Sequence, residues 1–217
     1  MTARMTTRPI SLAIVQNRRS PKEPQSAYPT DLAQGGLLTT LTLHLGSIGN
    51  ESMRSGSMHV SERDGAVRAE LVMPGTICPF GPLEGQLCDQ WNNVEWHAPA
   101  AMILDFGAVP PGAPPIQDDG GYAFHIFTPE TERTTHYFFG SSGSYGEEEA
   151  WMPKMIGELQ NRVFLEEDNP MMEAIEERMA GRDFWDLKPA ILSSDAAAVR
   201  VRRKIAKLCR QEARVPG

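Results

Sequence analysis

The hydrophobic pattern of this 217-residue chain changes once, near residue 146, and that change limits the possible folds. Before it, apolar and polar residues alternate with the period of two that is typical of strands. After it, apolar residues recur every four positions, as on one face of a helix. These residues are Trp151, Met155, Leu159 and Val163. Strands followed by helices predict an α+β fold, with the helices gathered on one face of an antiparallel sheet.

The strand region begins with a clear hairpin. Asp64-Gly65 is a turn pair suited to two positive φ angles, and it separates the predicted strands Ser57–Arg63 and Ala66–Met73. A loop rich in Pro and Gly is expected over 74–90. Further strands are predicted at Trp91–His97, Ala101–Val109, Tyr122–Phe127 and Arg133–Phe139. We therefore expect a single sheet of about six or seven strands.

The helical region is expected to end in two defined pieces. One runs from Pro170 to Ala180, with Gly181 as a natural stop. The last helix is expected to begin at a cap formed by Ser193 or Ser194. Its apolar stripe consists of Ala198, Val201, Ile205 and Leu208.

Composition narrows the class of protein. The net charge of -7 argues against general nucleic-acid binding, and no apolar run reaches membrane-spanning length. The length suits one domain, which we place at 37–217, after a poorly ordered lead-in at 1–36. The three cysteines match no zinc pattern, so reduced thiols in a cytoplasmic protein are expected.

Asp168 is the acidic residue that this pattern singles out. On a continuous helix it shares a face with Phe164, Met172 and Ile175. An acid on an apolar face is costly unless a cation, a metal or hydrogen bonds accompany it, so Asp168 is a candidate metal ligand. Alternatively, Asn169-Pro170 is the start of a new helix, and Asp168 only precedes its cap.

Three motifs in order resemble one enzyme family. They are Thr-Pro-Glu-Thr-Glu followed by His-Tyr-Phe-Phe-Gly at 128–140, the acidic stretch at 166–176, and Lys-Pro-Ala-Ile-Leu-Ser-Ser-Asp-Ala-Ala-Ala-Val-Arg-Val at 188–201. Together they resemble the catalytic domain of Rieske non-haem iron oxygenases of the vanillate O-demethylase and dicamba monooxygenase type. The resemblance implies a helix-grip (START-like) fold, in which a curved antiparallel sheet packs on long C-terminal helices. It also implies O₂-dependent oxidation of a methoxy-aromatic acid at a mononuclear Fe(II).

The resemblance also implies which residues face the metal. The family binds iron through two histidines and one carboxylate. Asp168 matches the carboxylate and His44 the second histidine, whereas the first histidine position holds Thr39, or Thr40 after a shift of one residue. A hydroxyl is a poor replacement for imidazole on Fe(II), so we expect weak or absent iron binding by this chain.

A second departure concerns the family's [2Fe-2S] cluster, for which no Cys-x-His ligand pair is present. A truncated copy, or a reading-frame change before about residue 43, is expected to account for both losses. By resemblance the partners are a small aromatic acid, a reductase or ferredoxin that supplies electrons, and further copies in a homotrimer.

For the substrate, the resemblance points to His125, Asp105 and Leu159. His125 matches a histidine that contacts the substrate carboxylate. We expect affinity to weaken above about pH 6.5 as the imidazole loses its proton, unless a neutral imidazole N–H suffices. Asp105 and Leu159 stand where the family type has an asparagine and a tryptophan. An acid at the first position is expected to repel a carboxylate. The alternative role for His125 is a strand histidine that is paired with a backbone carbonyl.

The basic residues of the last helix have two interpretations. They form a solvated face, or they dock an acidic electron-transfer partner.

For the function of the whole chain, the first hypothesis is an aromatic O-demethylase or monooxygenase domain. The alternative is a non-catalytic helix-grip domain that binds an aromatic acid or acts as a subunit.

Overall fold

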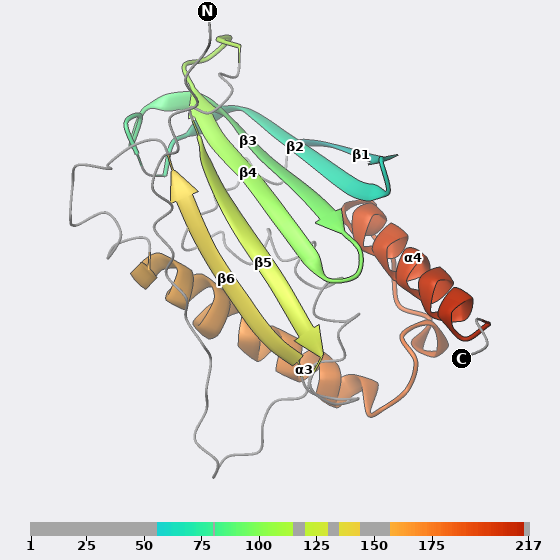
Figure 1. The fold of residues 1–217 in the computed structure, drawn as a ribbon. Coiled ribbons are helices and arrows are strands. Elements are labelled where there is room, and N and C mark those ends of the chain that lie inside the picture. Colours follow the sequence, from blue (N-terminus) through green and yellow to red (C-terminus); the bar gives the residue numbers. More distant parts are fainter. Residues whose placement is uncertain (1–55, 80, 115–119, 130–134, 144–156, 215–217) are drawn as a thin grey trace, which may run out of the picture.

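The computed structural model describes residues 56–79, 81–114, 120–129, 135–143 and 157–214. Six strands form one antiparallel sheet in the order β1-β2-β3-β4-β5-β6, so each strand pairs with its neighbour in sequence (Figure 1). The strands are β1 (Ser57–Arg63), β2 (Ala66–Ile77), β3 (Leu87–His97), β4 (Ala101–Val109), β5 (Gly121–Pro129) and β6 (Thr135–Gly143). The predicted lead-in at 1–36 lies outside the described residues.

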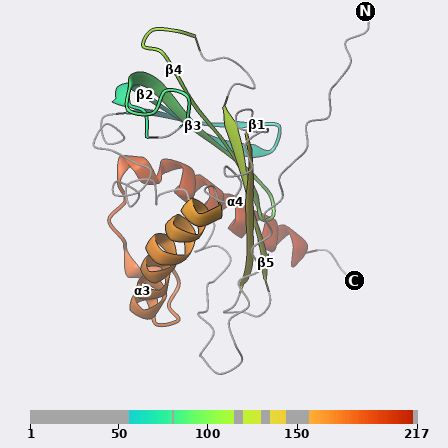
Figure 2. The same cartoon turned by 90° about the vertical axis from the view of Figure 1, so that its left-hand side faces the viewer.

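Helices follow the strands, as the single change of periodicity predicted. Residues 157–179 form one helical run that contains a π-helical segment, η3 (Arg162–Asp168), and then α3 (Asn169–Met179). Two short 3₁₀ turns, η4 (Trp185–Leu187) and η5 (Ser193–Asp195), lead to α4 (Ala196–Glu212). Figure 2 shows α3 lying to one side of the sheet. None of the described helices is long and apolar enough to cross a membrane.

Strands β2 and β3 extend further than the sequence pattern predicted. A bulge between Met73 and Thr76 lets β2 continue through Pro74 and Gly75, and β3 already starts at Leu87. The carboxylate of Asp89 stabilises this extension because it accepts hydrogen bonds from the Gly75 and Gly112 amides, both at 2.8 Å. These two backbone hydrogen bonds lower the pKa of Asp89.

The helical run does not break at Pro170, so the alternative of a new helix starting there is wrong. Proline lacks an amide proton, and in a regular α-helix its ring clashes with the carbonyl four residues earlier. The wider π turn ends at Asp168, just before this proline, and π turns relieve such local conflicts. The last helix also starts differently, because Asp195 and not a serine accepts the Leu192 amide at 2.7 Å.

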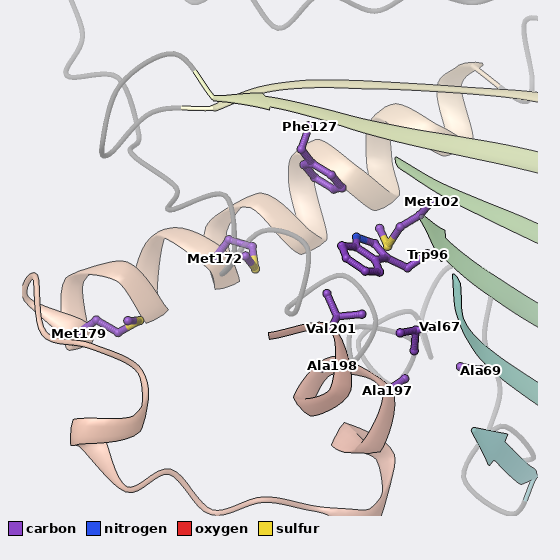
Figure 3. Packing of buried hydrophobic residues seen from close by; sticks show 10 residues of the cluster. All are labelled: Val67, Ala69, Trp96, Met102, Phe127, Met172, Met179, Ala197, Ala198 and Val201. Carbon is purple, nitrogen blue, oxygen red and sulfur yellow. The ribbon is translucent and has the colours of Figure 1, made fainter. Parts of the chain in front are cut away.

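Alternation along the strands gives the sheet two distinct faces. The helix-facing side carries Val67, Trp96, Met102 and Phe127, which pack against α3 and α4 (Figure 3). From the helices, Met172, Met179, Ala197, Ala198 and Val201 complete this core. The family-implied arrangement of an antiparallel sheet packed on C-terminal helices is therefore confirmed.

The strand register builds one continuous row of side chains across the whole helix-facing side. Directly paired residues point to the same face of an antiparallel sheet. From β1 to β6 the row reads Glu62, Val67, Trp96, Met102, His125 and Phe139. Its four apolar members, Val67, Trp96, Met102 and Phe139, are at most 2% exposed, so between Val67 and Phe139 a polar imidazole is set into a closed apolar stretch.

Candidate functional site

His125 is the polar residue around which the candidate site is built. It lies on β5 between the core residues Ala123 and Phe127 on the same face, and only 4% of its surface is exposed. The ring of Phe164, from the helical run, meets the imidazole edge to face with centroids 5.1 Å apart. Sheet and helix therefore enclose this imidazole.

Tyr137 is the hydrogen-bond partner of this imidazole. Its hydroxyl oxygen lies 2.6 Å from Nδ1 of His125, and the two residues come from the paired strands β5 and β6. The Tyr137 ring also stacks on Phe127, with centroids 4.8 Å apart. The tyrosine is thus held on both its polar and its apolar side, which fixes the orientation of the imidazole that it contacts.

Asp168 completes the polar group from the opposite layer. It is 3% exposed and ends the π-helical segment that contains Phe164. Burial first, and the negative charge of Asp168 second, raise the pKa of Tyr137 well above its ordinary value. Asp168 is therefore close enough to act electrostatically on Tyr137, which contacts His125, so Tyr137 lies between the predicted metal residue Asp168 and the predicted substrate residue His125.

Burial decides the protonation of this group. Desolvation lowers the pKa of His125 to about 3, because a cation is costly inside an apolar core. The imidazole is therefore neutral at pH 7, and the expectation of a protonated ring that loses its charge above pH 6.5 is wrong. Since Tyr137 keeps its proton, its hydroxyl can donate to Nδ1, which leaves the ring proton on Nε2 as a hydrogen-bond donor.

Asp105 does not belong to this site, which corrects its assignment as a substrate residue. His125 pairs with Met102, so the residues of β4 that share its face are Met102, Leu104 and Phe106. Asp105 points to the other face. Its carboxylate accepts hydrogen bonds there from Trp91 Nε1 at 3.0 Å and Asn93 Nδ2 at 3.4 Å. It therefore has a structural role on the outer face.

The remaining candidates have varied positions. Leu159 is half-buried in the first turn of the helical run, and its contact with substrate stays a prediction. His44, Thr39 and Thr40 lie outside the described residues. His136 is exposed on the outer face of β6, near Phe138.

Tyr137 was not predicted from the sequence as a site residue. The alternation of β6 nevertheless places it on the same face as Phe139, which pairs with His125 on β5.

Comparison with known proteins identifies the family. Residues 42–211 match the family model described as the vanillate O-demethylase oxygenase C-terminal domain. The chain belongs to this family. The resemblance inferred from the three sequence motifs is thereby confirmed.

Individual members of the family show the same relationship. The oxygenase component of dicamba O-demethylase from Stenotrophomonas maltophilia is 37% identical over 155 residues, which is 69% of this chain and 46% of that protein. The oxygenase component of a chloroacetanilide N-alkylformylase from Rhizorhabdus wittichii is 32% identical, with 79% and 51% covered. The chain thus spans about half the length of these relatives.

Solved structures agree with the sequence matches. Dicamba monooxygenase bound to 3,6-dichlorosalicylic acid superposes with a TM-score of 0.79 at 31% identity, covering 88% of this chain and 58% of that one. The same enzyme is known with non-haem iron and dicamba, and this structure superposes with a TM-score of 0.67 and covers 87% of this chain and 56% of that one. The chain therefore has the fold of the catalytic half of a non-haem iron oxygenase.

The vanillate O-demethylase family raises the question of iron in this chain. A two-histidine, one-carboxylate centre needs three protein ligands. In the part of the chain that the structure describes, Asp168 is a buried carboxylate, but no group of three His, Cys, Asp or Glu side chains is arranged to hold a metal. The described donor set therefore does not amount to such a centre.

We expect the full chain to bind Fe(II) more weakly than about 1 μM in anaerobic calorimetry, since the position that the resemblance gives to the first histidine holds a threonine. Asp168→Ala should remove whatever heat remains, and Asp186→Ala, at an exposed aspartate, serves as the matched control. Tight 1:1 binding that depends on Asp168 would show instead that another group of the chain completes the centre.

Proposed function

We propose that this chain is the catalytic domain of an aromatic O-demethylase or related monooxygenase, and that it binds an aromatic acid beside His125. The observation that carries this proposal is the buried His125–Tyr137 pair facing Asp168 between sheet and helix. Burying polar groups inside an apolar core is costly, so a buried group of this kind indicates a structural or a ligand-binding role. Because the chain belongs to a family of oxygenases, the ligand-binding role is supported.

Each residue has a distinct part in this proposal. The neutral imidazole of His125 donates its Nε2 proton to the carboxylate of the acid, while Tyr137 fixes the tautomer and the ring orientation. The rings of Phe164 and Phe139, whose centroids are 4.8 Å apart, exclude water from the aromatic body of the acid. Leu159 on the adjacent helical turn is proposed as a further apolar contact.

Asp168 and His44 are the two candidate iron ligands of this chain, one imidazole short of the family's set. In the family, the metal supplies oxygen activation beside the substrate. Electron supply from a ferredoxin or reductase belongs to the same proposal, since the relatives are oxygenase components. The function as a whole rests on the likeness to proteins of which this chain spans about half.

A second candidate function is a non-catalytic domain that binds an aromatic acid. Two sequence observations favour it: the position that the resemblance gives to the first iron-binding histidine holds a threonine, and no Cys-x-His pair for the cluster is present. Binding of the acid distinguishes little between the two candidates, because both need His125. Iron distinguishes them, since a catalytic domain should bind the acid differently when Fe(II) is present and Asp168 is intact.

Binding of a benzoate-type acid tests the site directly. We expect vanillate or dicamba to bind the full chain without iron, and His125→Ala to weaken binding by roughly 10- to 100-fold, as a lost hydrogen bond to a charged group predicts. Tyr137→Phe should weaken it less, because the imidazole stays but its tautomer is no longer fixed. Ligand-observed NMR titrations measure all three proteins.

The matched control is His136→Ala, the same substitution at an exposed outer-face position of the neighbouring strand. It should leave the affinity unchanged. Between pH 6.5 and 8.5 the affinity should be constant, because a bound carboxylate raises a neighbouring pKa by roughly 1–3 units and the pKa of His125 starts at about 3. Equal affinity of wild type and His125→Ala would remove this residue from the site.

A further inference from the structure

The exposed side of α4 carries a row of positive charge that the candidate site does not use. The helix contains six basic residues and one acidic residue, in a chain whose net charge is -7. Four of the basic residues are exposed and follow each other at helical spacings of three, four and three. This basic stripe consists of Arg200, Arg203, Lys207 and Arg210. Such spacing puts all four on one side of the helix, over about 15 Å.

The opposite side of the same helix is already occupied. Ala198 and Val201 are buried against the sheet, and Ile205 packs on the same core cluster. Arg202 and Lys204 have structural contacts, because Arg202 stacks on Phe184 at 4.0 Å and Lys204 pairs with Glu62 at 3.4 Å. The fold therefore accounts for these two cations but not for the basic stripe.

Local electrostatics do not account for the stripe either. A cation in the last turn of a helix is stabilised by the helix dipole, which explains Arg210. Arg200 is the fifth residue of α4, nearer the N-terminal end, where the dipole does not stabilise a cation. Like charges at spacings of four destabilise a helix by a few tenths of a kcal/mol per pair, as for Arg203 and Lys207. Within the described residues, no ion pair to an acidic group offsets the charge of any of the four.

An exposed tryptophan lies beside the stripe. The guanidinium of Arg203 is 6.0 Å from the ring centroid of Trp185, and this indole is 41% exposed. Tryptophan and arginine are the residues that contribute most often to the centres of protein interfaces. Figures 1 and 2 show that the C-terminal part of α4 projects beyond the sheet, where a partner can approach it.

We propose that the basic stripe and Trp185 form the docking surface for an acidic protein, the electron carrier that the proposed function requires. The proposal rests on that function for the identity of the carrier, but not for the existence of the surface. An anionic membrane fits less well, since a membrane-bound amphipathic helix needs a free apolar face and that of α4 is buried. At 0.1 M salt, charges further away than about 10 Å are largely screened. A partner that approaches α4 is therefore attracted by the basic stripe more than it is repelled by the net negative charge of the whole chain.

Binding of the full chain to an immobilised acidic [2Fe-2S] ferredoxin tests the surface by biolayer interferometry. We expect binding that weakens as salt is raised from 20 to 300 mM, and that falls at least about 10-fold in the double variant Lys207→Glu/Arg210→Glu. Trp185→Ala should weaken it at every salt concentration. The matched control is Arg162→Glu/Arg178→Glu, which changes the net charge equally at exposed positions of the helical run at 157–179.

The outcomes separate this surface from the aromatic-acid site. His125→Ala should lose the acid and keep the ferredoxin, and the α4 double variant should do the reverse. Equal loss in the control double variant, or no ferredoxin binding by the wild type at 20 mM salt, overturns the proposal. So does tighter stripe-dependent binding to a 20-base-pair DNA duplex or to vesicles of phosphatidylcholine and phosphatidylserine.

Discussion

Acidification from pH 6.5 to pH 4.5 should destabilise the domain by about 2–3 kcal/mol through His125 alone. The ordinary pKa of a histidine is 6.5, and burial lowers the pKa of His125 to about 3 in the folded chain. Below pH 6.5 the unfolded chain therefore binds a proton that the folded chain does not. The free energy of unfolding falls by about 1.4 kcal/mol per pH unit until the folded pKa is reached.

The measurement is urea unfolding of the full chain at several pH values, compared with His125→Asn. The asparagine has no titratable group, so its stability should depend less steeply on pH in this range. His136→Asn is the matched control, the same substitution at an exposed position of the neighbouring strand, and should keep the wild-type slope. Equal slopes for wild type and His125→Asn would mean that the folded site accepts the proton, for example through the nearby charge of Asp168.

The fold was largely predictable because local rules and tertiary packing agree. The Asp64-Gly65 turn fixes the first hairpin, and both residues have the positive φ angles expected of them, 52° and 83°. The first and fourth strands have the predicted bounds. The extension of β2 and β3 was missed because Pro74 and Gly75 are typical of loops. A bulge and the Asp89 hydrogen bonds, which join residues distant in sequence, keep them in the sheet.

The candidate site was predictable only in part, because its geometry depends on register. Asp168 stood out as an acid on an apolar face, and His125 stood out through the resemblance to the family. The pairing of His125 with Met102 and Phe139 determines which residues lie on the same face as His125, and no local sequence pattern reveals that pairing. A difference of one position on β4 separates Leu104, on the site's face, from Asp105 on the other. Tyr137 was missed for the same reason, since its role comes from the strand beside it.

The neutral state of His125 has a consequence for the proposed binding of an acid. A protonated imidazole attracts any anion, whereas a neutral one offers a single hydrogen-bond donor of fixed direction. The fixed direction comes from Tyr137, whose own proton is retained because burial and Asp168 raise its pKa. Selectivity in this site is therefore expected to depend on the shape of the acid around the Nε2 donor more than on its charge.

The row that contains His125 also contains the residue whose loss should cost the most stability. Trp96 is fully buried, pairs with Val67 on one side and Met102 on the other, and belongs to the core between sheet and helices (Figure 3). Trp96→Ala should lower the free energy of unfolding by about 3–5 kcal/mol, through lost burial and the cavity left behind. That is a large part of the 5–15 kcal/mol typical of a domain.

Trp185→Ala provides the matched control, since it removes the same side chain from a position that is 41% exposed. It should cost about 1 kcal/mol or less, mainly its contacts with Phe184 and Arg203. Urea unfolding followed by far-UV circular dichroism measures both. Because Trp96 supports Met102, which supports His125, the surviving folded fraction of Trp96→Ala should also bind aromatic acids more weakly. A cost equal to that of Trp185→Ala would mean that helices and sheet do not share one core.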